Sequence, residues 1–287
     1  MIRYLPALSL LALLLLPALA QESTGTLARV AASQRFVIGY VPDAAPLSFR
    51  DEAGQPAGYS IELCRVIADA VKRRLGLDEL TVDYVPLVKP GERIDAVVSG
   101  RVDIECGAST ITLDRREKVD FTLITLITGA SSLSLAKAGI NSNAELNGKT
   151  VAVAGDTTTE SALEEFLAAN EFTAEIVITE THAAGLALLD QGEVDAYVSD
   201  QTILLGHIIA AADPSNYRLA PDVFSFEPYG FMVRKDDSAF RLVADRALAG
   251  VFRTPRIQRL YQTWFGRYGI PQSRVLKAMY EAQSFTK

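Results

Sequence analysis

The chain has 287 residues, of which 49% are apolar and 22% charged, a composition that supplies an ample hydrophobic core. Its formal net charge of −7 argues against the classes of protein that bind nucleic acid or anionic lipid through a basic surface. With only two histidines and no recognisable spacing of metal ligands, the sequence also argues against a metal site.

Residues 1–20 are predicted to be a cleavable signal peptide. Arg3 gives a positive start, an apolar stretch runs from Leu8 to Leu16, and Ala18-Leu19-Ala20 matches a small-x-small cleavage site. The alternative is a membrane anchor, but the apolar stretch is shorter than the roughly 20 residues that a spanning helix needs. We therefore expect an exported, soluble, periplasmic protein that starts at Gln21.

Strands and helices are expected to alternate in the first part of the mature chain. The expected elements are a loose leader (21–33), a buried strand (36–41), a helix (59–75), a strand (81–86), a short helix (93–99) and a strand at 102–104. This order predicts parallel sheets covered by helices. In such sheets, ligands bind beyond the carboxyl ends of the strands.

The most informative stretch, residues 105–116, lies at such an end. It reads Glu-Cys-Gly-Ala-Ser-Thr-Ile-Thr-Leu-Asp-Arg-Arg. Small residues let backbone N–H groups approach a ligand, Thr110 adds a hydroxyl, and the guanidinium of Arg115 fits a carboxylate through two parallel bonds. Together these groups could hold the α-carboxylate of an amino acid. The alternative is an ordinary turn in which Thr112 caps a helix and Arg115 is a solvated charge.

The second part of the chain repeats the alternation. We expect strands at 150–153 and 176–179, helices at 161–169, 182–190 and 201–211, and a crossing at 224–229 that leads to a strand at 230–233. Helices at 237–252, 255–265 and 272–284 complete the chain. Thr157 followed by Glu160 fits a capping box, although a helix start of this kind can also bind an anion.

A short internal echo suggests two similar lobes. Residues 191–198 resemble residues 99–104, since both contain a glycine, a charged residue and then Val-Asp before a strand. If Gly192 matches Gly100, then Asp200 matches Ala108, and the two positions would face each other across a cleft. One lobe would bring N–H groups and Arg115, and the other a carboxylate, which together complement a zwitterion.

The only cysteines are Cys64, in an expected helix, and Cys106, just after a strand. Two cysteines in an exported chain often pair. Two buried thiols that act as small apolar side chains are the alternative.

Residues 107–121 look like the signature of the periplasmic solute-binding proteins that serve ABC importers of polar amino acids. Their lead-in, Glu105-Cys106-Gly107, resembles the glutamate/aspartate-binding branch, and the likeness runs from about Phe36 to Phe265. The resemblance implies two α/β lobes of the type II class, joined by two crossover segments, with the ligand in the cleft. It places lobe I at 34–128 and 230–287 and lobe II at 129–229. It also implies hinge closure, a membrane permease as partner, a monomer, no cofactor and no enzymatic activity.

The resemblance also assigns roles to individual residues. It implies that Arg115 clamps the α-carboxylate and that Asp200 takes the α-ammonium group. The other ligand-binding residues that it implies are Ala108 (N–H), Thr110 (hydroxyl and N–H), Thr157 and Thr158 (helix-start amides), His182 (near the ligand) and Arg93 (side-chain carboxylate).

Four positions depart from the family pattern. Asp156 stands where a glycine is usual, and Ala44 and Pro90 replace the aromatic residues that sandwich the ligand. Val41 stands where the acidic branch has an arginine that holds the side-chain carboxylate, and Arg93 matches a second arginine of that branch. Arg93 would then hold a side-chain carboxylate alone. Glutamate or aspartate is the first candidate ligand, and a neutral polar amino acid or another small organic acid stays open.

Two other functions remain open at this point. The fold also resembles periplasmic dehydratases, in which Glu105, Glu160 or Asp156 would have to serve as the general acid. A ligand-sensing partner of a signalling receptor is the third possibility. Neither reading has a motif of its own in the sequence.

Overall fold

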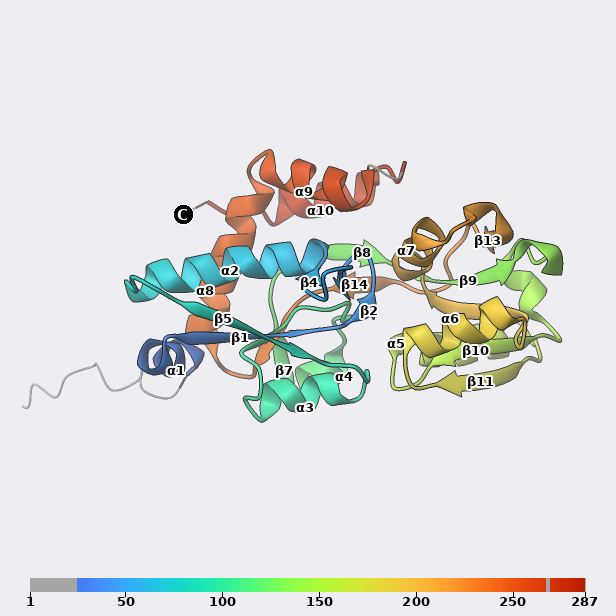
Figure 1. Ribbon diagram of the computed structural model, residues 1–287, viewed down its shortest axis with the longest axis horizontal. Helices are drawn as coiled ribbons and strands as arrows, with labels where there is room; N and C mark the ends of the chain where they lie inside the picture. Colours follow the sequence, from blue (N-terminus) through green and yellow to red (C-terminus); the bar gives the residue numbers. More distant parts are fainter. Residues whose placement is uncertain (1–24, 267–268, 287) are drawn as a thin grey trace, which may run out of the picture.

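The computed structural model describes residues 25–266 and 269–286, so the predicted signal peptide and its cleavage site lie outside the described residues. Two α/β lobes lie side by side along the long axis of the molecule (Figure 1). Each lobe is built on one five-stranded sheet. The predicted fold class, a two-lobed α/β protein of the type II class, is confirmed.

Lobe I contains both ends of the described chain. Its five-stranded sheet has the order β5-β1-β6-β15-β7, with β1 Arg35–Tyr40, β5 Thr81–Pro86, β6 Ile104–Glu105, β7 Val119–Phe121 and β15 Met232–Arg234. A small sheet holds β2 Asp43–Ala44, β3 Ser48–Arg50 and β4 Pro56–Ala57. Its helices are α1 Thr26–Ser33, α2 Tyr59–Leu75, α3 Glu92–Val98, α4 Leu113–Arg116, α8 Ser238–Phe252, α9 Arg256–Trp264 and α10 Arg274–Ala282.

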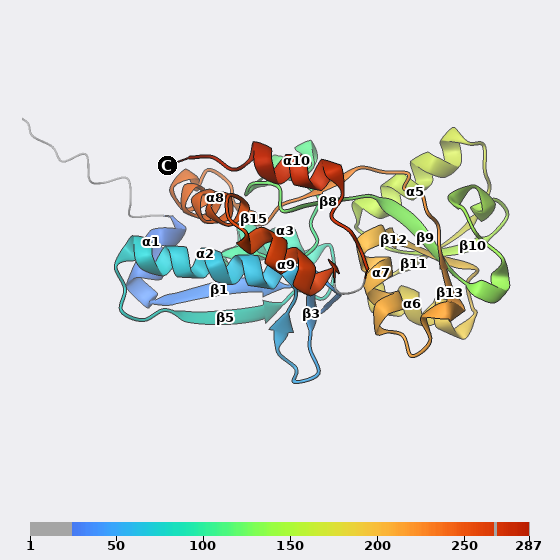
Figure 2. The ribbon, with the colours of Figure 1, turned by 90° about the horizontal axis from the view of Figure 1, so that it is seen from above.

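Lobe II is one continuous piece of chain between two crossings. Its sheet has the order β11-β10-β12-β9-β13, with β9 Ala130–Leu135, β10 Thr150–Ala154, β11 Glu175–Thr179, β12 Ala196–Asp200 and β13 Tyr217–Leu219. Its helices are α5 Thr158–Ala169, α6 His182–Gln191 and α7 Gln201–Ala210, with short 3-10 turns at 136–138, 143–146 and 214–216. The crossings are β8 Leu126–Thr128 and β14 Glu227–Tyr229, which pair with each other between the lobes (Figure 2). These strands are consistent with the proposed boundaries of lobe II at residues 129 and 229.

The expectation of purely parallel sheets is wrong in one strand of each lobe. β15 runs antiparallel to both of its neighbours in lobe I, and β9 does so in lobe II. Each of these strands directly follows a crossing. A chain that arrives from the other lobe enters the sheet at the cleft edge, where the parallel strands end, and must therefore run in the opposite direction.

Both faces of each sheet are covered, which explains the continuous apolar runs of the strands. In lobe I, Phe36 and Ile38 pack with α2 and α8 on one face, and Val37 packs with the α3 residues Ala96 and Val97 on the other. Lobe II repeats this arrangement, with α5 on one face of the sheet and α6 and α7 on the other. No helix among the residues that the structure describes is long and apolar enough to cross a membrane.

The expected loose leader is wrong for residues 26–33, which form helix α1. Its first residue, Thr26, is fully buried and donates through its backbone N–H and its hydroxyl to Oδ2 of Asp237, at 2.7 and 2.6 Å. The preceding Gly25 offers no side-chain cap. The cap comes instead from Asp237, which also accepts from the N–H of Phe240 at the start of α8.

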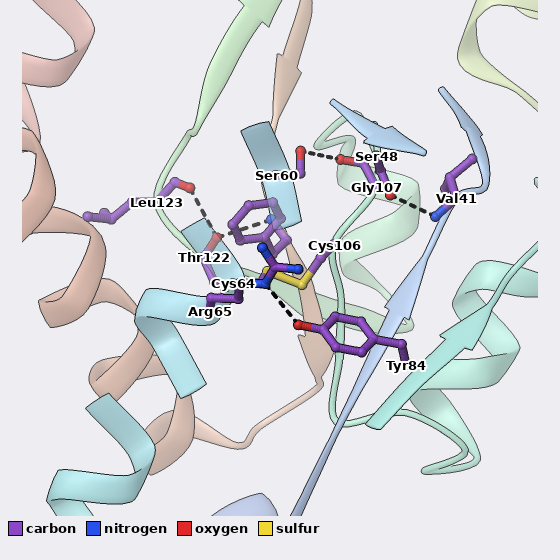
Figure 3. The surroundings of a disulfide bond; sticks show 11 residues. Val41, Ser48, Ser60, Cys64, Arg65, Tyr84, Cys106, Gly107, Thr122 and Leu123 are labelled. Atoms are coloured by element: carbon purple, nitrogen blue, oxygen red, sulfur yellow. Dashed lines mark hydrogen bonds between the residues drawn. A yellow bond between two sulfur atoms is a disulfide. The ribbon is translucent and has the colours of Figure 1, made fainter. Parts of the chain in front are cut away.

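A disulfide joins Cys64 of α2 to Cys106, the residue after β6 (Figure 3). Of the two alternatives left open by the sequence, the structure therefore has the bonded one. One turn earlier on α2, the hydroxyl of Ser60 donates to the carbonyl oxygen of Gly107 at 2.9 Å. Helix α2 thus fixes the start of the Gly107–Arg115 stretch at two points.

The internal echo corresponds to two equivalent turns. Gly100 and Gly192 both have a φ of 74°, in the left-handed region that favours glycine. Asp103 accepts from the N–H of Val37 at 2.8 Å, and Asp195 accepts from the N–H of Thr150 at 2.9 Å, so each aspartate ties its turn to the parallel strand next to the one that follows. Both turns therefore deliver a strand end to the cleft.

Candidate functional site

A small cavity lies between the lobes, at the carboxyl ends of the parallel strands. Lobe I lines it with Pro90, Gly91, Arg93, Ile94, Ala108, Ser109, Arg115 and Met232, and lobe II with Asp156, Thr157, Thr158, Thr159, His182 and Asp200. The structure thus brings seven of the eight sequence-predicted ligand residues to one cavity. The eighth, Thr110, is buried beside Ser109 and does not line it.

Arg115 is positioned by the short helix α4. The Thr112 hydroxyl caps this helix and accepts from the N–H of Arg115 at 3.1 Å, while Nη1 of Arg115 donates to the carbonyl oxygen of Thr110 at 2.9 Å. Burial and the neighbouring Arg93 lower the pKa of the Arg115 guanidinium. The expected helix cap at Thr112 is confirmed, but Arg115 is not a solvated charge, because it is half-buried and lines the cavity.

Arg93 lies on α3 and is only 6% exposed. Its Nε and Nη2 atoms are buried without a hydrogen-bond partner. A buried guanidinium with unused donors is costly unless an acceptor group reaches it. It is also ready to bind an anionic group that enters the cavity.

Glu105 is fully buried beside these arginines, and burial raises the pKa of its carboxyl group although Arg93 and Ser109 act in the opposite direction. A Cβ atom on Gly107 would lie 2.2 Å from Oε1 of Glu105 and 2.5 Å from Cγ2 of Val41. Only glycine therefore fits at position 107, which is packed against the side chains of Glu105 and Val41. Val41 occupies this space with an apolar side chain.

The start of α5 brings lobe II to the cavity. The Thr157 hydroxyl accepts from the N–H of Glu160 at 3.1 Å and donates to the carbonyl oxygen of Ala154 at 2.7 Å. The predicted capping box is wrong in one detail, because the Glu160 carboxylate accepts from the N–H of Asp156 at 2.8 Å rather than from that of Thr157. Since the Thr157 hydroxyl is used in capping, its backbone N–H is the group left for a ligand.

Asp156 has a φ of 58°, which explains why glycine suits this position. Its carboxylate lies against Gly91 of the opposite lobe, where a Cβ atom would be 2.7 Å from Oδ2. Asp156 is exposed and stands at the edge of the cavity.

Asp200 ends strand β12 and is 6% exposed. Its Oδ2 accepts a short hydrogen bond from the hydroxyl of Tyr229, and its Oδ1 accepts from the hydroxyl of Thr159 at 3.3 Å. It stands at the N-cap position of α7 but makes no capping bond. Burial and the nearby Glu227 raise the pKa of the Asp200 carboxyl group to about 7. A cation in the cavity would return this group to its charged form.

His182 begins α6 and is almost fully buried. Its Nδ1 lies 2.8 Å from the hydroxyl oxygen of Tyr197. Burial lowers the pKa of the imidazole to about 4, so the ring is neutral near pH 7. It therefore gives the cavity a polar wall without charge.

Two residues that the sequence analysis did not single out belong to the site. Glu227 and Tyr229 lie on the crossing strand β14, and both are buried. The Thr110 hydroxyl, expected to donate to a ligand, donates instead to Oε2 of Glu227 at 2.6 Å. A three-residue strand is too short to show a periodic pattern, so the sequence does not mark this glutamate and tyrosine. Their place in the site becomes clear only from the pairing of the strands.

The two lobes are in contact around the cavity. Nζ of Lys89 lies 2.9 Å from Oε1 of Glu180. Three residues along the chain from Glu180, the N–H of Ala183 donates to Oδ2 of Asp43 at 3.0 Å. The two lobes therefore contact each other directly through polar groups. Within the described ranges, no group of three or more potential metal ligands gathers, here or elsewhere.

Comparisons with known proteins agree with this architecture. The model of the bacterial extracellular solute-binding proteins, family 3, matches residues 36–267. The chain is 34% identical over 255 residues to the L-glutamate/L-aspartate-binding protein of Pseudomonas aeruginosa. The matched region covers 88% of this chain and 84% of that relative. It is 29% identical over 266 residues to the glutamate/aspartate import solute-binding protein of Escherichia coli, covering 91% and 88%.

Among solved structures, the chain resembles an ancestral amino acid-binding protein described as a precursor of cyclohexadienyl dehydratase. The TM-score is 0.71 and the identity 28%, with 84% of this chain and 99% of the other covered.

Proposed function

Because the chain belongs to the bacterial extracellular solute-binding proteins of family 3, we propose that it is the ligand-binding component of an ABC importer for polar amino acids. It captures the ligand between its lobes and presents the closed form to a membrane permease. The named relatives are binding proteins of transport systems rather than enzymes.

One observation carries the proposal. Arg115 of lobe I and Asp200 of lobe II, from opposite sides of the cleft, line the same cavity. A guanidinium and a carboxylate in this arrangement complement the α-carboxylate and α-ammonium groups of a zwitterion. A ligand held by both lobes stabilises the closed state over the open one, as a population shift requires.

We further propose an acidic amino acid, glutamate or aspartate, as the ligand. The buried, unpartnered nitrogen atoms of Arg93 support a second anionic group near Arg115. The two relatives are named for glutamate and aspartate. Ala108, Thr157 and Thr158 would contribute backbone N–H groups, and His182 a neutral wall.

The destination of the protein is part of the same proposal. The family is one of extracellular solute-binding proteins. We propose export to a periplasm after cleavage of residues 1–20, and a monomer that meets its permease only when it delivers the ligand.

The dehydratase alternative has one point in its favour, the likeness to an ancestral precursor of such an enzyme. Of the three candidate acids, Asp156 lines the cavity, but the other two do not suit the task. Glu105 is fully buried and does not line the cavity, and Glu160 is engaged with the backbone of Asp156. A general acid must reach the group that it protonates.

A thermal-shift screen of the mature chain from Gln21 tests the proposal. The panel holds the common L-amino acids, their D-forms and small dicarboxylates, and Arg115→Ala and Asp200→Ala serve as controls. A ligand at about 1,000 times its Kd adds ~4 kcal/mol of stability, which raises the melting temperature by roughly 8–16 °C at this size. We expect L-glutamate or L-aspartate to give such a shift and both variants to lose it. A shift only with a compound that lacks an amino group would refute the amino-acid assignment.

A further inference from the structure

Glu227 is a buried acid at the junction of the two lobes and the crossing. It is 3% exposed, and both of its carboxylate oxygens are engaged. Oε2 accepts from the Thr110 hydroxyl of lobe I at 2.6 Å and from the Thr158 hydroxyl of lobe II at 2.9 Å. Oε1 accepts from the Ser225 hydroxyl at 2.7 Å.

The backbone fixes this arrangement. Glu227 pairs with Thr128 in the β8–β14 ribbon. Two residues further on, Tyr229 forms a β-bridge with Thr110, and the N–H of Ile111 donates to the carbonyl oxygen of Pro228 at 2.8 Å. The carboxylate of Glu227 is therefore held beside the ligand-binding stretch by strand pairing.

The hydrogen-bond directions have a chemical consequence. A hydroxyl group carries one proton and two lone pairs, so a threonine that donates to a carboxylate has only acceptor capacity left. Thr158 lines the cavity, and its oxygen lies 3.2 Å from that of Thr110. Toward a ligand, the Thr158 oxygen can therefore accept a hydrogen bond but cannot donate one.

The charges at this end of the site point the same way. Glu227 lies close enough to Asp200 for its charge to raise the pKa of the Asp200 carboxyl group. Two neighbouring carboxylates repel each other in a buried site, and a cation near both relieves the repulsion. The positive charge of Arg115 acts on both groups, but its Nη1 is already bonded to the carbonyl oxygen of Thr110.

We propose that Glu227 is a specificity-determining residue that makes the site demand an ammonium group. It accepts hydrogen bonds from the Thr110 and Thr158 hydroxyls, so that the Thr158 oxygen can only accept from the ligand. It also adds a second negative charge beside Asp200. An analogue with an oxo group in place of the amino group has only acceptors to offer to these acceptors and negative charges, and is rejected. This inference rests on the proposed function and assigns a role to a residue outside the predicted site.

Calorimetric titration with a matched pair of probes tests the inference. L-glutamate and 2-oxoglutarate differ only at the amino position. The Kd for 2-oxoglutarate divided by the Kd for L-glutamate therefore reports recognition of the ammonium group. Glu227→Gln keeps the shape of the side chain and removes its charge. We expect the ratio to fall at least about tenfold, because the ammonium group loses a neighbouring negative charge and the fixed orientation of the Thr158 hydroxyl. The fall should come from weaker binding of L-glutamate, whereas 2-oxoglutarate should bind as weakly as before or more tightly.

Two further variants separate specificity from structure. Ser225→Ala removes the partner of Oε1 but keeps the carboxylate, and should leave the ratio unchanged. Thr158→Val removes one of the oriented hydroxyls, and should lower the ratio in the wild type but not in Glu227→Gln. If Glu227→Gln weakens both probes equally, Glu227 is only a structural link between the lobes and the inference is wrong, whereas the amino-acid function stands. If wild type binds neither probe nor any amino acid of the thermal-shift panel, both proposals fail together.

Discussion

Replacing Arg93 by methionine should separate an acidic ligand from a neutral one. Methionine is apolar and of similar length, so it fills the space without the charge. The matched control is Arg101→Met, since Arg101 is also in lobe I but is 47% exposed and paired with Glu92 at 2.7 Å. An exposed pair of this kind contributes little to stability and lies outside the cavity lining.

The size of the effect follows from the unused donors of Arg93. Its Nε and Nη2 can each give a charge-assisted bond to a ligand carboxylate, worth ~1.5–3 kcal/mol apiece. Loss of both, about 3–6 kcal/mol, raises the Kd for L-glutamate by roughly 10²- to 10⁴-fold. The side-chain amide of L-glutamine has a single carbonyl oxygen to accept from Arg93. It therefore loses one such bond, ~1.5–3 kcal/mol, and its affinity should fall only about 10- to 100-fold.

The ligand-free variant should be at least as stable as wild type, because a buried, unpartnered guanidinium is costly in the folded protein. The attraction to Glu105 is lost, but burial already favours the neutral form of that carboxyl group. Calorimetric titration gives the affinities and thermal unfolding gives the stability. Unchanged affinity for L-glutamate, or equal losses for L-glutamate and L-glutamine, would refute the assignment of Arg93 to a ligand carboxylate.

Three other predictions test the fold and its closure. The double substitution Cys64→Ala with Cys106→Ala removes a cross-link across a sequence separation of 42. The free energy of unfolding should fall by about 4 kcal/mol and the melting temperature by roughly 8–16 °C. A loss below ~1 kcal/mol in calorimetry would contradict this expectation. Asp200 has a folded pKa of about 7 against 3.8 for the free group, so the folded protein keeps a proton that the unfolded chain releases. The contribution of Asp200 to the stability of the ligand-free protein is therefore present at low pH and is lost as the pH rises to about 7. Equal pH slopes of the unfolding free energy for wild type and Asp200→Asn, measured by denaturant titration, would count against this expectation. A Cβ atom on Gly206 of α7 would lie 2.0 Å from a backbone carbonyl oxygen of lobe I, whereas one on Gly250 of α8 meets nothing within 4 Å. Gly206→Ala should hold the lobes apart, with a larger radius of gyration in X-ray scattering and weaker binding, whereas Gly250→Ala should leave both at wild-type values.

Local sequence was sufficient where a pattern is carried by neighbouring residues. The helix at 59–75 matches α2, because apolar spacing and the Gly76 stop lie within the segment itself. The echo around Gly100 and Gly192 anticipated two equivalent turns, since each needs a left-handed glycine and an aspartate at a fixed offset.

Local sequence failed where the partner of a group is remote. The start of α1 looked like a loose leader because its cap is Asp237, 211 residues away. The antiparallel direction of β9 and β15 follows from the crossings, which no strand pattern encodes.

The ligand-binding stretch shows the same division. The residue types at 107–115, with Arg115 and a carboxylate expected at Asp200, could be read from the chain as the complement of a zwitterion. Whether a hydroxyl in that site donates or accepts depends on what else lies within hydrogen-bond distance. For Thr110 and Thr158 the deciding group is Glu227, which is 117 and 69 residues away along the chain. The chemical groups of the site can thus be read from the order of residues. Their hydrogen-bonding direction and charge depend on the fold, because it brings the crossing strand between the lobes.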